Sequence, residues 1–482
     1  MELTHIAVTV ILALLYSALL PGRWRGWALL IVSIVAIYWL GTPLAIRNLD
    51  FILPTATLVL AGAVWLFTLP ADARPTRQDG ITLGVAGAVV LAIAATRYLD
   101  EALRPTPTRP PDVLPVALGL LIAGGAVIII WRALRNRQTA LLYGGIAAIL
   151  LIFVVLKLEP LTVEASRALR ELSGQQPDLA RAADIAWLGF SYVAFRLIHL
   201  LRDRQTGRLP LLTLQETLAY TIFFPAFTAG PIDRAERFQK DWLALPQLTG
   251  LDAARWTEGI TRVAVGICKK FVFADSLVLL SLNAANAGQA DSAPGLWLLL
   301  YGFGIRLWLD FAGYSDIAIG LGFLFGIRLP ENFDRPYLQH NLVQFWQRWH
   351  KTLSDWARFY VFSPLSRALL TRRRPPKLKP TQVVFVAQLA TMLTIGLWHG
   401  VSWSFIVWGL WHGIGLFVHK LWSDRTRKWY LGLREKPRLK RAWTAAGVLL
   451  TFHFVTLGWV WFALPEIGTA AQTFARLFGM GF

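Results

Sequence analysis

The chain has 482 residues, of which 55% are hydrophobic and only 16% are charged, whereas a soluble protein carries roughly 25% charged residues. The net charge of +19 would suggest a nucleic-acid partner in a soluble protein, but here the basic residues lie in short connections between long apolar runs. The composition therefore argues against a soluble protein and against binding of nucleic acid. The single cysteine, Cys268, excludes an internal disulfide framework and a cysteine-based metal cluster, and we expect no bound metal.

Apolar runs recur along the whole chain, and each is near the ~20 residues that a helix needs to cross a bilayer. They lie at about 5–20, 27–46, 51–69, 81–96, 113–131, 138–156, 184–201, 212–230, 260–282, 294–312, 381–398, 401–421 and 443–464. The pattern predicts an all-α polytopic membrane protein with roughly 11–13 membrane helices. The first run follows Glu2 and has no basic residue before it, so we expect a retained span rather than a cleavable signal peptide.

Basic residues in the first half gather in alternate connections, which the positive-inside rule places in the cytoplasm, with the N-terminus outside. The residues concerned are Arg23, Arg25, Arg74, Arg77, Arg132, Arg135, Arg137, Arg202, Arg204 and Arg208. Basic runs at 372–379 and 425–441 are also interpreted as cytoplasmic. Topology and contact with anionic membrane lipid explain these charges. A docking face for an acidic carrier protein is the alternative.

The chain contains no soluble domain. Residues 1–183 consist of hydrophobic spans with few polar groups and end in a segment, 157–183, whose composition is typical of an amphipathic helix. We interpret 1–183 as a scaffold and 184–482 as the catalytic core. No internal repeat of the kind found in many secondary transporters is present.

Residues 330–380 are unusually polar for a membrane protein. Their aromatic and leucine residues recur at three- and four-residue steps, which predicts one face of a helix; these are Trp346, Trp349, Leu353, Trp356 and Tyr360. Such a segment cannot face lipid along its length. It must lie at the interface or line a cavity among other helices.

Two histidines stand next to tryptophans in this part of the chain: His350 in the polar segment and His399 in Gly396-Leu-Trp-His-Gly400. His399 is predicted to end the first helix of an apolar hairpin at 381–421, close to the tip Gly400-Val-Ser402. An imidazole at membrane depth is costly, and it can exchange a proton near neutral pH. Both residues are candidates for catalysis; a hydrogen-bonded core role is the alternative.

From about 184 to 464 the chain resembles the membrane-bound O-acyltransferase (MBOAT) family, in particular the bacterial alginate O-acetyltransferase and teichoic acid D-alanyl transfer proteins. The matching motifs are Phe224-Pro225 with Ala229-Gly-Pro-Ile232, Gly266-Ile-Cys-Lys-Lys270 through Ala274-Asp275, Asp310-Phe-Ala-Gly-Tyr-Ser-Asp-Ile-Ala-Ile-Gly320, Pro330-Glu-Asn-Phe-Asp-Arg-Pro-Tyr337, Phe345-Trp-Gln-Arg-Trp-His350 with Leu353-Ser354, and Gly396-Leu-Trp-His-Gly400 with Trp403. The chain departs from the family pattern in three places. They are Phe359, where Asp is expected, Ser366-Arg367 in place of Gly-Gly, and Ala463, where the alginate-type proteins usually carry Arg.

The resemblance implies an MBOAT-like fold in the bacterial cytoplasmic membrane, with re-entrant or interfacial helices around a central cavity. It also implies transfer of an acyl group, expected to be acetyl, from a cytoplasmic thioester to hydroxyls of an extracytoplasmic polysaccharide, as in alginate O-acetylation. His399 would be the base that activates the hydroxyl, and His350 its partner. Supporting or substrate-binding roles fall to Asn332, Tyr314, Ser315, Asp316, Arg348, Trp349 and Trp398.

No tightly bound cofactor is expected, and acyl-CoA or an acyl carrier protein would be the co-substrate. A periplasmic or extracellular acyltransferase is an expected partner. Transfer of D-alanyl or a longer acyl group to a teichoic acid, lipid or peptide remains open. Two other classes of protein also remain open. A membrane transporter would have ionisable residues spread along a pathway, and loss of a histidine would favour an inactive acyl-binding subunit.

Overall fold

The computed structural model describes residues 2–70, 72–248, 250–371 and 378–481, and this part of the chain contains helices and no strand. Most of the predicted basic run at 372–379 lies outside the described residues. The all-α prediction is confirmed.

The chain forms two compact units, which are described separately. The first unit comprises Met1–Val263 and Ile317–Pro330, and the second comprises Ala264–Asp316 and Glu331–Phe482. The chain passes between them three times: within α11 (Ala253–Ile267), within α13 (Ala293–Leu324) and after Pro330. The functional division at residue 183 stays a prediction.

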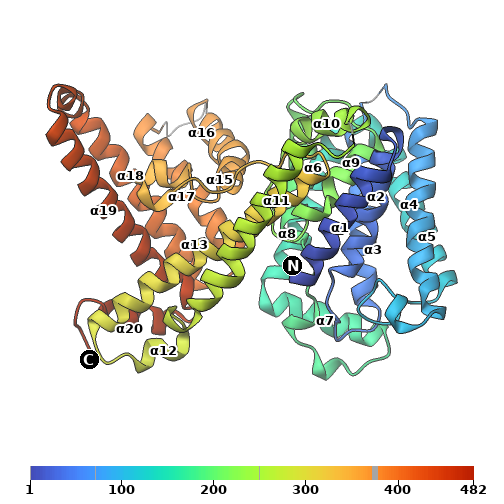
Figure 1. Ribbon diagram of the computed structural model, residues 1–482, viewed down its shortest axis with the longest axis horizontal. Helices are drawn as coiled ribbons and strands as arrows, with labels where there is room; N and C mark the ends of the chain where they lie inside the picture. The colour runs from blue at the N-terminus through green and yellow to red at the C-terminus, as the bar shows by residue number, and fades with distance from the viewer. Residues whose placement is uncertain (1, 71, 249, 372–377, 482) are drawn as a thin grey trace. The chain divides into compact units, whose positions relative to one another are not determined.

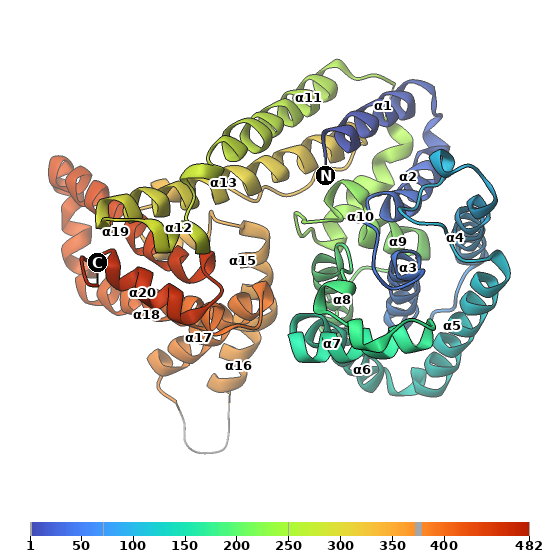
Figure 2. The ribbon, with the colours of Figure 1, turned by 90° about the horizontal axis from the view of Figure 1, so that it is seen from below.

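The first unit is a bundle in which α8 packs against both α3 and α6 (Figure 2). Its helices are α1 (Leu3–Leu19), α2 (Gly22–Trp39), α3 (Leu49–Thr68), α4 (Arg77–Ala95), α5 (Val113–Leu134), α6 (Gln138–Lys157), α7 (Glu159–Leu172), α8 (Phe190–Gln205), α9 (Leu214–Ile222) and α10 (Ala235–Ala244). The predicted amphipathic segment after residue 157 forms α7, which buries Thr162, Ser166 and Arg170. Arg170 binds Asp184 at 2.8 Å and so ties the helix to the start of the following segment.

The apolar run at 212–230 is not one continuous span. Helix α9 ends at Ile222, and a single 3₁₀ turn, Phe224–Ala226, follows it. Pro225 lacks a backbone N–H, so the helix cannot continue with regular hydrogen bonds. The buried guanidinium of Arg196 donates to the carbonyls of Thr221 and Ala226, at 2.8 Å each. This arginine therefore satisfies backbone groups that the broken helix leaves open.

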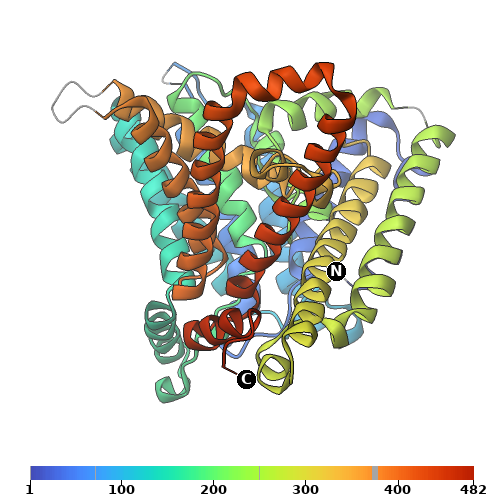
Figure 3. The ribbon, with the colours of Figure 1, turned by 90° about the vertical axis from the view of Figure 1, so that its left-hand side faces the viewer.

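The second unit contains α12 (Ala284–Gln289), α14 (Leu342–Trp346), α15 (Lys351–Ala357), α16 (Ser363–Leu370), α17 (Pro380–His399), α18 (Trp403–Gly432), α19 (Pro437–Ala463) and α20 (Ile467–Arg476). Helices α17 and α18 form the predicted hairpin, and α18 packs in turn against α19 (Figures 1 and 3). A Cβ at Gly396 would come within 2.5 Å of the Phe405 carbonyl oxygen, so glycine permits this close approach. The hydroxyl of Ser402 caps α18 by accepting a hydrogen bond from Phe405 N.

Among the described residues, six helical segments are long and apolar enough to cross a membrane. They are Leu49–Thr68, Arg77–Tyr98, Val113–Lys157 (which includes α5 and α6), Ala293–Leu324, Pro380–His399 and Pro437–Ala463. A multi-pass membrane protein is therefore confirmed. The remaining predicted spans correspond to helices that are shorter, broken or more polar, and the total of 11–13 stays a prediction.

The expectation of one helical face through 346–360 is wrong in one respect. The segment is divided into α14, which ends at Trp346, and α15, which begins at Lys351. His350 adopts the left-handed conformation with φ 43°. The N–H of Lys351 bonds to the Asn332 carbonyl oxygen at 2.9 Å. Because that donor is taken by the segment around Asn332, the helix is interrupted at His350.

Candidate active site

His350 lies in a turn held by the segment that precedes it in sequence. The backbone N–H of Asp334 donates to the Arg348 carbonyl oxygen at 3.1 Å, and the side chains of the same two residues form an ion pair. With the Lys351–Asn332 bond, these contacts hold the turn on both sides of the histidine. A non-glycine residue in the left-handed region costs energy and persists only where its surroundings impose it.

Asn332 is the buried link between this turn and α13. Its side chain is fully buried; its Nδ2 donates to Ser315 Oγ at 3.2 Å, and its Oδ1 accepts from Thr352 Oγ1 at 2.9 Å. The backbone N–H of Thr352 points at the same Oδ1 from 3.4 Å. One amide thus joins three segments of the second unit. Asn332 and Ser315 therefore support the turn that contains His350, through these hydrogen bonds.

The imidazole of His350 is buried in an aromatic environment. It makes an edge contact with the ring of Phe311, at 4.6 Å between centroids, and lies 6.0 Å from the ring of Trp398. Its Nε2 has no hydrogen-bond partner among the described residues. Burial, and secondarily the nearby His399, place the pKa of His350 well below its usual value, so the imidazole is neutral near neutral pH.

His399 ends α17, as predicted, and is partly buried. Its ring lies 4.5 Å from the ring of Trp398, 4.7 Å from that of Phe462 and 5.9 Å from that of Phe405. Phe405 on α18 and Phe462 on α19 pack against the end of α17 and orient the imidazole.

The structure brings the two histidines together through Trp398. The separation of the two imidazole centroids cannot exceed the sum of the distances from His350 to Trp398, 6.0 Å, and from Trp398 to His399, 4.5 Å. A substrate or a short chain of waters, at about 3 Å per hydrogen bond, can span such a distance. The His350–His399 pair is therefore a single site, within one compact unit.

The other predicted residues lie around this pair. Tyr314 is buried on α13 next to Ser315, and Asp316 binds Lys269 at 2.6 Å, which gives the aspartate a structural ion pair.

Trp349 is buried in an aromatic cluster with Tyr337, Phe345 and Trp459, at centroid distances of 5.5, 5.6 and 5.0 Å. Arg348 is partly exposed and is paired with Asp334. Among the residues predicted for substrate contact, Trp398 lies next to both imidazoles.

Several residues around the histidines were not predicted, and Phe405 and Trp408 beside His399 are among them. Phe311 and Phe462 contact the two imidazoles, and Thr352 binds Asn332. Phe311 lies inside the motif that begins at Asp310, and Thr352 follows His350 by two residues, so motif position could have indicated both. Phe462 carries no such signal, because its proximity depends on how α19 packs.

The site holds two neighbouring imidazoles in a multi-pass membrane protein. One is buried and neutral, and the other lies at a helix end. Such a pair is suited to proton transfer during attack by a hydroxyl. The model of the membrane-bound O-acyltransferase family matches residues 148–457, which include both histidines and their neighbours except Phe462. The chain belongs to this family and is a membrane O-acyltransferase of the bacterial membrane.

Relatives with assigned names match the same region. A teichoic acid D-alanyltransferase from Streptococcus thermophilus is 34% identical over 287 residues, covering 58% of this chain and 68% of that protein. A protein named "Probable alginate O-acetylase AlgI" from Pseudomonas fluorescens is 32% identical over 299 residues, with 61% and 54% coverage. A peptidoglycan O-acetyltransferase from Helicobacter pylori is 31% identical over 296 residues, with 58% and 52% coverage. The match thus spans about two thirds of the first of these proteins and about half of the other two.

Proposed function

We propose that this protein transfers an acetyl group from a cytoplasmic thioester to hydroxyl groups of an extracytoplasmic polysaccharide. The observation that carries the proposal is the His350–Trp398–His399 arrangement, which offers two imidazoles to one reacting centre. Two of the relatives are named for O-acetylation, one of alginate and one of peptidoglycan.

In the proposed reaction the acceptor hydroxyl oxygen attacks the thioester carbonyl carbon. His399 removes the hydroxyl proton as the new C–O bond forms. The C–S bond then breaks, and the proton passes from the imidazolium to the departing thiolate, so no further reactant is required. Water is kept from the intermediate by the surrounding rings of Trp398, Phe405 and Phe462.

His350 has a different proposed role, because it is buried and neutral. A neutral imidazole can donate one N–H hydrogen bond to the developing oxyanion or pass a proton to and from His399. Asn332, through Ser315 and Thr352, acts as a positioning residue for this imidazole. Tyr314, Arg348 and Trp349 are proposed to shape the surroundings of the reacting groups.

The donor is proposed to be acyl-CoA or an acidic acyl carrier protein. The end of α18 and the start of α19 present exposed basic residues: Arg425, Arg427, Lys428, Arg434, Lys436, Arg438, Lys440 and Arg441. CoA phosphates and an acidic carrier surface share the negative charge that would bind here. A periplasmic or extracellular acyltransferase that receives or directs the acyl group is a further proposed partner.

Transfer of D-alanyl to a teichoic acid is the second candidate. It is favoured by the teichoic acid D-alanyltransferase relative, which is 34% identical and is covered to 68% of its length. The acyl group and the donor distinguish the two candidates.

The experiment supplies purified protein in liposomes with radiolabelled acetyl-CoA, acetyl carrier protein or D-alanyl carrier protein. Alginate oligomers, peptidoglycan fragments and lipoteichoic acid serve as acceptors, and His399→Ala is the control for uncatalysed transfer. Acetyl transfer to a polysaccharide, absent in the control, is expected. Transfer of D-alanyl without acetyl would replace the first proposal by the second. Absence of transfer from every thioester would contradict both.

A further inference from the structure

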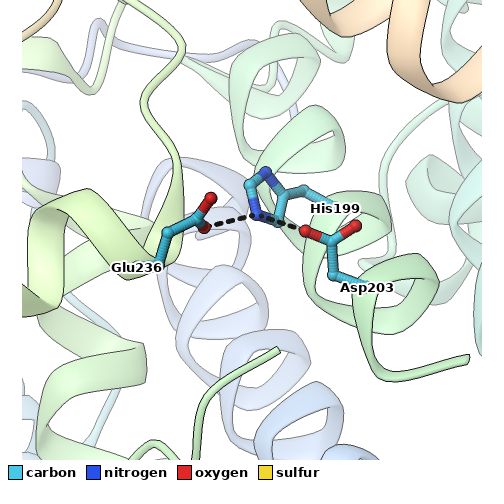
Figure 4. A group of neighbouring side chains, drawn as sticks. All are labelled: His199, Asp203 and Glu236. Atoms are coloured by element: carbon cyan, nitrogen blue, oxygen red, sulfur yellow. Dashed lines mark ion pairs between the residues drawn. The ribbon is translucent and has the colours of Figure 1, made fainter. Parts of the chain in front are cut away.

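A second cluster of ionisable groups lies in the first unit, apart from the histidine pair. His199 and Asp203 stand one turn apart on α8, and Glu236 lies in the first turn of α10. Figure 4 shows the imidazole of His199 between the two carboxylates, with the ring edge directed at both. The proposed acyl transfer uses none of these three residues.

The distances between these groups suit a metal ion. His199 Nε2 lies 3.3 Å from Asp203 Oδ2 and 3.7 Å from Glu236 Oε2. One ligand atom from each residue lies within 4.8 Å of the other two. With metal–ligand distances of 2.0–2.2 Å, neighbouring ligands in a tetrahedral zinc site are separated by about 3.3 Å. Rotation of the half-exposed Glu236 side chain can close the difference.

Direct hydrogen bonding accounts less well for this spacing. An imidazolium N–H bound to a carboxylate is separated from the oxygen by about 2.7–2.9 Å, and both distances from His199 Nε2 exceed that range. One N–H shared between two carboxylates forms only a three-centre hydrogen bond. An ion between the three ligand atoms would be within bonding distance of all of them.

Charge in the cluster also favours a cation. Asp203 and His199 are almost fully buried, and both carboxylates lie near the guanidinium of Arg234. Arg234 Nε binds Glu236 Oε1 at 2.9 Å, whereas Oε2 of the same carboxylate is the atom that faces His199. Arg234 Nη2 also lies 3.7 Å from Asp203 Oδ2, so the same guanidinium lies beside both carboxylates. Carboxylates that bind a metal are often held by such an outer hydrogen bond.

We propose that His199, Asp203 and Glu236 bind one divalent transition-metal cation per chain, with water completing the coordination. An imidazole with carboxylate oxygens suits zinc and related cations rather than calcium or magnesium. Such an ion would join α8 to α10 and hold the ends of the intervening segment, which contains the break after α9. Its role would be structural, because three protein ligands on two helices constrain their separation.

The test uses the full chain, purified without a histidine tag, stripped with chelator and titrated with zinc or cobalt. We expect one zinc per chain by calorimetry and elemental analysis, and the visible absorption of tetrahedral cobalt. Glu236→Gln should weaken zinc binding by at least about tenfold without unfolding the protein, because this side chain is partly exposed. His199→Gln should abolish it.

His340→Gln is the matched control, since it removes a partly exposed histidine outside the cluster and should leave zinc binding unchanged. Chelator should lower the unfolding temperature of the wild type and of the control by more than that of Glu236→Gln. Equal zinc contents in the wild type and Glu236→Gln, or no zinc in the wild type, would overturn the proposal. Neither result depends on acyl transfer.

Discussion

Replacing Asn332 with alanine should weaken both the stability of the second unit and the activity. The side chain makes two short hydrogen bonds, to Ser315 Oγ at 3.2 Å and from Thr352 Oγ1 at 2.9 Å, in a site with no exposure. Each is worth about 1 kcal/mol, and a buried group left without a partner adds a further penalty. We therefore expect the free energy of unfolding to fall by about 2–3 kcal/mol.

Activity should fall by more than the loss of folded protein alone would explain. Without the amide, the turn at His350 keeps its backbone contacts but loses its link to α13 through Ser315. Displacement of a catalytic group by about 1 Å can cost up to a hundredfold in rate. We expect kcat to fall at least about tenfold, with a smaller change in KM.

The assays are thermal unfolding in detergent and initial rates of acyl transfer on the folded fraction. Asn286→Ala is the matched control, because Asn286 also makes two side-chain hydrogen bonds, at 2.8 and 2.9 Å, but on the exposed α12. It should leave kcat unchanged. An Asn332→Ala protein with wild-type kcat would refute the positioning role, whatever its unfolding temperature.

Three further predictions concern the histidines and the sidedness of the hairpin. His399→Ala should lower kcat by about 10²–10⁴-fold, the usual contribution of a general base, in protein that remains inserted and folded; full transfer by the purified variant would remove His399 from catalysis. His350→Ala should reduce the same rate strongly but less completely, and an unchanged rate would leave it a packing role only. In a Cys268→Ser background, a cysteine at Ser402 should react with a membrane-impermeant thiol reagent from outside and one at Ser423 from the cytoplasm; labelling of Ser402→Cys only from the cytoplasm would contradict the cross-membrane route.

The sequence by itself determined the class of fold and identified the candidate catalytic residues. Apolar runs of nearly 20 residues predict membrane helices because a bilayer offers no partner for open backbone groups. The same reasoning singled out His350 and His399, since polar side chains are rare in such surroundings. The hairpin whose first helix ends at His399 also followed from the local pattern. Its two helices are uninterrupted, and the short turn Gly400–Ser402 separates them.

Only the tertiary structure decided how the helices break and what surrounds the site. Periodicity predicted a helix through His350, but the Lys351 N–H bonds to Asn332, a residue 19 positions earlier in the sequence. The apolar run at 212–230 likewise predicts one membrane span. In the structure the helix ends at Ile222, and Arg196 on another helix stabilises this break. Local patterns indicate the preference of a segment for a helix or strand, and a hydrogen bond from a distant segment, worth about 1 kcal/mol, can exceed that preference. The approach of His350 to Trp398, and of His199 to Glu236, depends on such contacts between segments and has no local signature.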